Sequence, residues 1–185
     1  MQPAKPSLDT PLWEYTLSVW SKTSFHGWSM QLQQQFGMRP AILVALAFAG
    51  HHQRCVNASD VGALIQVGAD FYHACQNKLK TLQQKIAHYQ GLGEEVWRTW
   101  NEVMEKTRIQ AMQVELADLH GQLWKCPMTF ATEGMAIQQN WYVYLQQLPL
   151  TESRRSEAEA MLSRLASGLQ EASRFHSEQI DQALS

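Results

Sequence analysis

Apolar residues recur along most of the chain at intervals of three and four, which is the spacing of amphipathic helices. The first such segments are Pro11–Lys22, Phe25–Phe36 and 40–48. Asp9-Thr10 offers a capping side chain before the first segment, and Gly37 suits the left-handed residue that ends the second. The segment 40–48 is apolar all round, which predicts a helix at the centre of a bundle.

Longer periodic segments follow, and few runs suit a strand. Asn57 or Ser59 caps a stretch that extends to about residue 89, which Gly68 and Asp70 could divide into two helices. The remaining predicted helices cover 94–124, 132–148 and Glu152–Ala183. We therefore predict an all-α fold: a single bundle of six to eight helices, with two long helices in the middle and a long amphipathic C-terminal helix.

The length of 185 residues fits one domain. We expect a short tail over residues 1–10, a helical domain over 11–149, and a C-terminal helix over 150–185 that packs on the same domain. The first residues lack the apolar core of a secretory signal, and no apolar run approaches the roughly 20 residues of a membrane span. Three widely spaced cysteines imply no disulfide framework, so we expect a cytoplasmic protein without membrane contact.

Charged residues make up 17% of the chain, and the formal net charge is −2. This balance argues against a nucleic-acid-binding protein, which would present a basic face. The 21 glutamines fall mostly on predicted helices and supply a neutral polar surface. Residues 1–93 carry a net charge of +3 and residues 94–185 carry −5, so the halves either pack on each other or polarise the surface toward a partner.

The densest group of soft metal ligands is His51-His52-x-x-Cys55. His51 and Cys55 would share a helical face if the helix continued that far, but a zinc site needs further ligands that the spacing does not supply. The alternative is a helix C-terminus at which histidine meets the helix dipole. We keep these three residues as weak metal candidates and predict no bound metal or cofactor.

Two acidic and histidine clusters lie on predicted helices, Asp70-x-x-His73 and Glu115-x-x-Asp118-x-His120. Carboxylate-bridged metal bundles need two such motifs and further carboxylates. We therefore expect these side chains to be solvated or to cap helices. The chain also lacks a glycine-rich phosphate loop and a Gly-x-Ser-x-Gly elbow, so nothing local predicts an enzyme.

Aromatic side chains are the more informative feature. Partly exposed aromatic residues often anchor protein interfaces, but they can also line a small-molecule pocket or fill the core. The candidates for an interaction surface are Trp97, Trp100, Trp141, Tyr142, Tyr144 and Phe175.

Several short motifs resemble a bacterial family of small uncharacterised proteins. They are Leu12-Trp13-Glu14-Tyr15, then Leu32-Gln33-Gln34-Gln35-Phe36-Gly37 before an apolar helix, then Leu79-Lys80-Thr81-Leu82 and the helix over 108–116. Gln83 stands where the family tends to repeat arginine. The resemblance covers roughly residues 12–148 and implies a small cytoplasmic helical protein of unknown function, with no catalytic residues to carry over.

These observations lead to two hypotheses. The first is a non-catalytic protein-interaction or regulatory module that binds a protein partner or a second copy of itself. The alternative is a small-ligand or metal-binding helical domain that uses the His51, His52 and Cys55 cluster or an aromatic pocket.

Overall fold

A computed structural model describes residues 7–22, 24–89, 91, 93–127 and 129–183, with the backbone alone for 22, 68, 70, 76, 80 and 170–183. The described chain is mainly helical, as predicted. Its elements in order are α1 Pro11–Lys22, α2 Phe25–Phe36, α3 Pro40–His51, β1 Arg54–Cys55, α4 Ala58–Phe71, the π-helical turn η1 Tyr72–Gln76, α5 Asn77–Ala87, α6 Glu94–Leu123, β2 Thr129–Phe130, α7 Glu133–Gln146 and α8 Glu152–Ala183.

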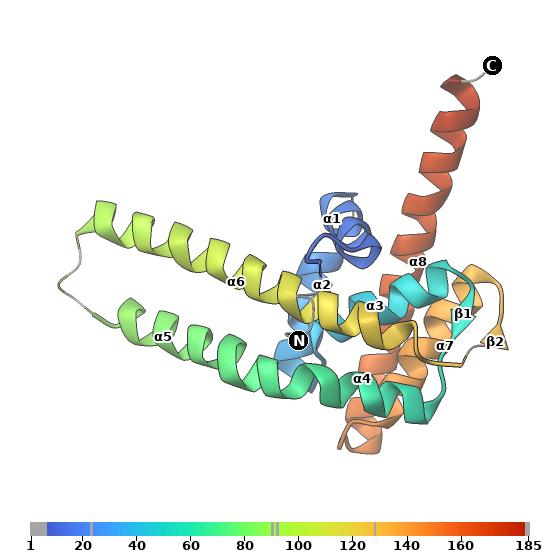
Figure 1. The fold of residues 1–185 in the computed structure, drawn as a ribbon, viewed down its shortest axis with the longest axis horizontal. Coiled ribbons are helices and arrows are strands. Elements are labelled where there is room, and N and C mark those ends of the chain that lie inside the picture. The colour runs from blue at the N-terminus through green and yellow to red at the C-terminus, as the bar shows by residue number, and fades with distance from the viewer. Residues whose placement is uncertain (1–6, 23, 90, 92, 128, 184–185) are drawn as a thin grey trace, which may run out of the picture.

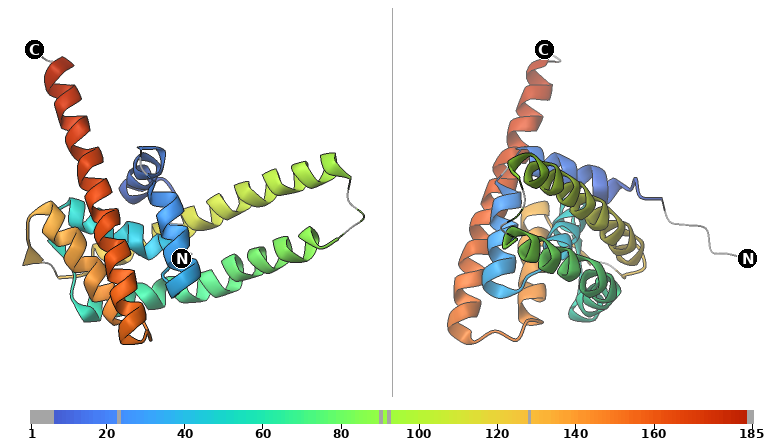
Figure 2. Two further views of the ribbon diagram at one scale, coloured as in Figure 1. Left: turned by 180° about the vertical axis from the view of Figure 1, so that it is seen from behind. Right: turned by 90° about the vertical axis from the view of Figure 1, so that its left-hand side faces the viewer.

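The helices form a body from which two extensions project (Figures 1 and 2). α1, α2, α3 and α7 gather with parts of α4, α6 and α8 in the body. α5 and the first half of α6 run side by side away from it as a hairpin, which we call the arm and define as α5 with residues 94–107. The later part of α8 projects in another direction (Figure 1).

α3 is the centre of the body, as its sequence predicts. Residues 41–50 are all buried, so this helix has no polar face to offer to water. Its closest neighbour is α7, and a Cβ atom added at Gly50 would lie 2.6 Å from the backbone nitrogen of Ile137. The two backbones can approach this closely only because residue 50 is glycine.

Local capping interactions explain where several helices begin and end. The backbone N–H of Trp13 donates to Oγ1 of Thr10 at 3.2 Å, which caps α1. Asn57 and Asp60 cap the start of α4 reciprocally, since each side chain accepts a hydrogen bond from the backbone N–H of the other. Gly37 has the predicted left-handed conformation, with φ of 72°, after α2.

The structure corrects two details of the sequence interpretation. The backbone stays helical through Gly68 and Asp70, and the interruption lies later, in the π-helical turn η1. A short antiparallel pair, β1 with β2, was not predicted, because two residues per strand are too few to show an alternating pattern.

The first half of α8 packs on its own chain, through buried Leu162, Leu165 and Leu169. Arg154 strengthens this packing because its guanidinium lies over the ring of Phe36 and donates to the backbone oxygen of Gln35. Of the described helices, none has the length and apolar character that a membrane span requires.

Candidate functional site

Arg39 lies at the turn between α2 and α3 and is 8% exposed. Gly37 ends α2, and Pro40 is the first residue of α3. The residue before a proline is restricted to extended backbone, and Arg39 accordingly has a ψ of 123°. This local sequence places the side chain of Arg39 inside the body, just before the central helix begins.

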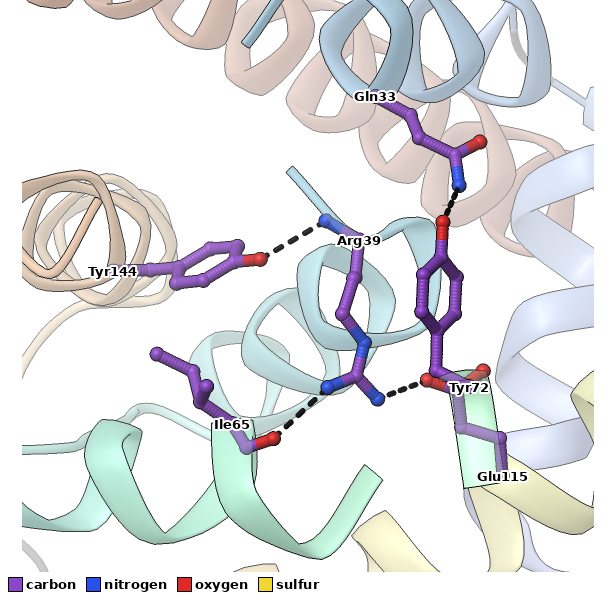
Figure 3. Close-up of polar contacts among 6 residues, drawn as sticks. All are labelled: Gln33, Arg39, Ile65, Tyr72, Glu115 and Tyr144. Atoms are coloured by element: carbon purple, nitrogen blue, oxygen red, sulfur yellow. Dashed lines mark hydrogen bonds and ion pairs between the residues drawn. The ribbon is translucent and has the colours of Figure 1, made fainter. Parts of the chain in front are cut away.

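The guanidinium of Arg39 is held by three elements of the body (Figure 3). Its Nη2 donates to Oε1 of Glu115 on α6, and its Nη1 donates to the backbone oxygen of Ile65 on α4 at 2.9 Å. The ring of Tyr72 in η1 lies 5.1 Å from the guanidinium carbon, within the range of a cation–π contact. A buried ion pair therefore joins helices that are distant in sequence.

Two hydrogen bonds extend this network (Figure 3). The backbone N–H of Arg39 donates to the hydroxyl oxygen of Tyr144 on α7 at 2.9 Å. Nε2 of Gln33 on α2 donates to the hydroxyl oxygen of Tyr72 at 2.5 Å. Burial raises the pKa of Tyr144 to about 12, so its phenol is neutral at physiological pH.

A cavity of about 320 Å³ adjoins this network on the side of α1, α2 and α6. One part of its lining is apolar, and the other part consists of side chains that can form hydrogen bonds. The apolar residues are Trp20, Met30, Pro40, Ala41, Ile109 and Met112. The polar residues are His26, Gln33, Tyr72, Glu105, Arg108 and Glu115.

The charges of the cavity balance each other. Glu115 is 2% exposed and is compensated by Arg39, while Arg108 lies 3.4 Å from Glu105. Burial raises the pKa of the Glu115 carboxyl group, and the guanidinium of Arg39 opposes part of that rise. An ionised Glu115 in this position depends on Arg39 remaining beside it.

The residues proposed as weak metal ligands do not converge on one point. α3 ends at His51, so His51 and Cys55 do not share a helical face. His51 pairs through Nδ1 with Oε1 of Glu133 at 2.7 Å, whereas the buried Cys55 donates to Oε1 of Gln139 at 3.5 Å. Across the described part of the chain, no three histidine, cysteine, aspartate or glutamate side chains are grouped to hold a metal ion.

The prediction that Glu115 is solvated is wrong, whereas its neighbour Asp118 is exposed. His73 is also exposed and lies 3.2 Å from Asn77, measured between Nδ1 and Nδ2, and the side chain of Asp70 lies outside the described residues. His120 is half-buried, and its Nε2 accepts a hydrogen bond from Nε1 of Trp124 at 2.7 Å.

We expect the burial of His120 to make stability depend on pH. Burial lowers the pKa of His120, so below about pH 6.5 the unfolded state binds a proton more readily than the folded state. The contribution of neutral His120 to stability is therefore lost as the pH falls from 7 to 5. Thermal unfolding measures the melting temperature at pH 7 and at pH 5. The drop in melting temperature between the two should be smaller for His120→Gln than for the unaltered protein. An unchanged difference would assign the pH dependence to other groups.

The aromatic residues proposed as one interaction surface occupy different environments. Trp141 and Tyr144 are each 1% exposed, so their assignment to a surface is wrong: the period of α7 turns both toward α3. Tyr142 is 48% exposed, and Trp97 and Trp100 are half-buried in the arm. The side chain of Phe175 lies outside the described residues.

Tyr142 and one side of Trp141 border a second cavity, of about 330 Å³, between α7 and α8. Most of its other lining residues are exposed, among them Gln138, Gln139 and Glu159. Unlike the cavity beside Arg39, this one has no buried charged group in its lining. It is therefore the weaker candidate for a specific binding site.

Sequence reasoning missed Arg39 and Tyr72 and misassigned Glu115. A signal for Glu115 was present, because it stands between Met112 and Leu119 at helical spacing, on an otherwise apolar stripe. A charged residue on such a stripe needs a partner inside the protein. The sequence did not identify that partner, because Arg39 is 76 residues away.

Comparison with known proteins identifies a family. A family model described as a protein of unknown function, DUF2390, matches residues 11–122. The matched segment contains Arg39 and all the residues that line the cavity beside it, but not α7 or α8. No curated protein and no solved structure matches the chain.

Proposed function

This chain belongs to the DUF2390 family, and we propose that it is a non-catalytic regulatory module that binds a small molecule in the cavity beside Arg39. The observation that carries the proposal is the buried carboxyl group of Glu115 in the cavity lining. Burying a charged pair has a large desolvation cost, so its presence at a cavity rather than within packed core favours a binding role.

The cavity has the properties of a small-molecule site. Its volume of about 320 Å³ lies at the lower end of the range typical of ligand pockets. Such pockets combine apolar walls with a few polar groups that orient the ligand. Here Trp20 and Met112 offer apolar surface, while Gln33 and Tyr72 offer hydrogen-bonding groups.

The balanced charges favour an uncharged ligand. Each acidic side chain in the lining is matched by an arginine, so an ionic ligand would lack a counter-charge. Nε1 of Trp20 is buried without a hydrogen-bond partner among the described residues, and a carbonyl oxygen on the ligand could accept from it. We therefore propose a mainly apolar, uncharged molecule that carries a hydrogen-bond acceptor.

Two features support binding and regulation rather than catalysis. Arg39 holds the carboxyl group of Glu115, so this group is not a free general base. α6 contributes Glu105, Arg108, Ile109, Met112 and Glu115 to the lining and also forms half of the arm. A ligand in the cavity would therefore contact the helix that carries the arm.

A titration with the neutral dye Nile red tests this proposal. At about 0.3 kcal/mol per non-hydrogen atom, a dye of this size should bind with a dissociation constant on the order of 10 μM. Met30→Trp places a larger side chain in the cavity and should weaken binding by about tenfold or more, because it occupies the space of the dye. Fluorescence enhancement of the dye measures the dissociation constant of the unaltered protein and that of the Met30→Trp variant.

Met135→Trp is the matched control, because Met135 borders the second cavity and is 65% exposed. It should leave the dissociation constant unchanged. Equal weakening by both variants, or by Met135→Trp alone, would contradict the proposed site. The anionic dye 8-anilinonaphthalene-1-sulfonate should bind more weakly than Nile red, and a preference for the anion would contradict the proposed ligand class.

Protein interaction is the second candidate function, and the arm is the observation that favours it. The arm extends beyond the body (Figure 1), and its apolar residues Leu82, Val96 and Val103 are exposed to solvent.

A further inference from the structure

The cavity beside Arg39 lies where the arm joins the body, between two walls that belong to different parts of the molecule (Figure 1). One wall comes from η1 and α6, the two elements that lead into the arm, and it includes Tyr72 and Ile109. The opposite wall comes from α1, α2 and α3 and includes Trp20 and Met30. A molecule in this cavity therefore contacts the root of the arm on one side and the body on the other.

The two walls are bonded to each other at the end of the cavity formed by Tyr72 and Glu115 (Figure 3). Nε2 of Gln33 donates to the hydroxyl oxygen of Tyr72 at 2.5 Å. The guanidinium of Arg39 binds Glu115 and lies over the ring of Tyr72. These contacts attach α6 at Glu115, and the start of η1, to α2 and to the turn before α3.

Nearer the arm, the polar and aromatic side chains pair within their own wall. Nη1 of Arg108 lies 3.4 Å from Oε2 of Glu105, both on α6. The rings of Trp20 and His26 pack edge to face on the opposite wall, with their centroids 5.0 Å apart. Among the described residues, no hydrogen bond or ion pair joins these four side chains across the cavity, and the buried Nε1 of Trp20 has no acceptor. A ligand would supply contacts between the walls that the protein itself lacks there.

Both helices of the arm can change direction at the level of the cavity. α5 is joined to α4 through the π-helical turn η1, in which the backbone N–H of Asn77 donates to the oxygen of Tyr72. Such turns are places where helices bend, and they are frequent at functional sites. α6 is unbroken, but long helices bend gently. Buried Leu116 and Leu119 fix the later part of α6 in the body, so the bending falls on the earlier part.

We propose that the direction of the arm depends on whether the cavity is occupied. A bound ligand bridges the two walls and restrains the arm to one direction, whereas the empty cavity leaves the arm free to tilt about η1. This inference rests on the proposed function and adds how the site acts on the rest of the molecule. By linkage, anything that restrains the arm strengthens ligand binding by the same factor.

The length of the arm amplifies a small change at its root. At 1.5 Å per residue, α6 extends about 20 Å from Ile109 to its first residue, Glu94. A tilt of about 10° at the cavity therefore moves the tip of the arm by about 4 Å. A displacement of this size is measurable between two labels on the full chain.

Double electron–electron resonance measures the spread of distances between the arm and the body. Spin labels are attached at Lys85→Cys on α5 and Ser156→Cys on α8, both exposed positions. Cys75→Ser removes the half-buried native cysteine, while Cys55 and Cys126 are buried and do not take up the label. Saturation with Nile red should narrow the distance distribution by about twofold, because the dye restrains the arm.

Met30→Trp tests the inference without the dye. The larger side chain fills the cavity from the wall on α2, so it should narrow the distribution by itself, and added Nile red should change it no further. Ile109→Trp fills the same cavity from α6 and replaces Met30→Trp if circular dichroism shows that the latter loses helical content. Met135→Trp, at the second cavity, is the matched control and should leave the distribution broad.

The outcomes separate this inference from the proposed function. If Nile red binds and the distribution keeps its width, the inference is overturned, whereas the binding site stands. If Nile red does not bind, the proposed ligand class is wrong, and the filled-cavity variants decide the inference: a narrowed distribution supports it, and an unchanged one overturns it. Equal narrowing by Met135→Trp would also overturn it, because the effect would not come from the cavity beside Arg39.

Discussion

Glu115→Ala is expected to lower the free energy of unfolding by about 3–5 kcal/mol, the largest effect of a single substitution that we predict. The change leaves Arg39 buried and charged, and arginine cannot lose its proton to relieve the cost. The adjoining cavity lets water approach the orphaned guanidinium, so we expect a value near the lower end of this range. Urea unfolding with linear extrapolation measures the change.

Asp118→Ala removes a carboxylate one turn along the same helix and serves as the control. Asp118 is exposed, so this variant should change the free energy of unfolding by less than about 0.5 kcal/mol. The double variant Arg39→Met with Glu115→Leu removes both charges and should recover most of the lost stability. If the double variant is as unstable as Glu115→Ala, the cost arises from lost packing rather than from an uncompensated charge.

Asn140→Asp is expected to destabilise the protein by about 3 kcal/mol, although the two side chains have nearly the same shape. Asn140 is fully buried on α7, and its Nδ2 donates to the backbone oxygens of Leu46 at 3.1 Å and Arg54 at 2.9 Å. Its Oδ1 accepts from the backbone N–H of Val56 at 2.8 Å. An ionised aspartate keeps this last bond but places its second oxygen against two carbonyl oxygens.

Gln138→Glu is the matched control, because it makes the same change from amide to carboxylate at an exposed position of α7. It should alter the free energy of unfolding by less than about 0.5 kcal/mol, as measured by urea unfolding. A comparable loss in both variants would show that added negative charge on α7, and not the hydrogen bonds of Asn140, determines the result.

The sequence predicted the helices well because helix boundaries depend on local signals. The structure confirms α1 and α2 with the predicted bounds, and α8 begins at the predicted Glu152. The apolar period, the cap at Thr10 and the left-handed Gly37 all act within one turn of the residues that they affect. The absence of a polar face on α3 likewise identified the central helix before its neighbours were known.

The candidate site could not be predicted in the same way. The cavity residues come from α1, α2, α3, η1 and α6, and a polar residue gives no local sign of which distant residue will satisfy it. Asn140 illustrates this limit, since the sequence places it beside two aromatic residues, whereas its hydrogen-bond partners lie 84 to 94 residues away. Trp141 and Tyr144 were assigned to a surface because their hydrogen-bond partners, Leu43 and Arg39, are likewise distant in the sequence.

The sequence by itself therefore determined the all-helical class, most helix bounds and the central position of α3, because these follow from short-range periodicity and capping. Only the tertiary structure decided which charged and polar residues are buried, that a cavity lies beside Arg39 and Glu115, and that Leu82, Val96 and Val103 of the arm stay exposed. Those properties depend on how helices far apart in the chain pack together, and packing selects partners by shape and charge that no local pattern records.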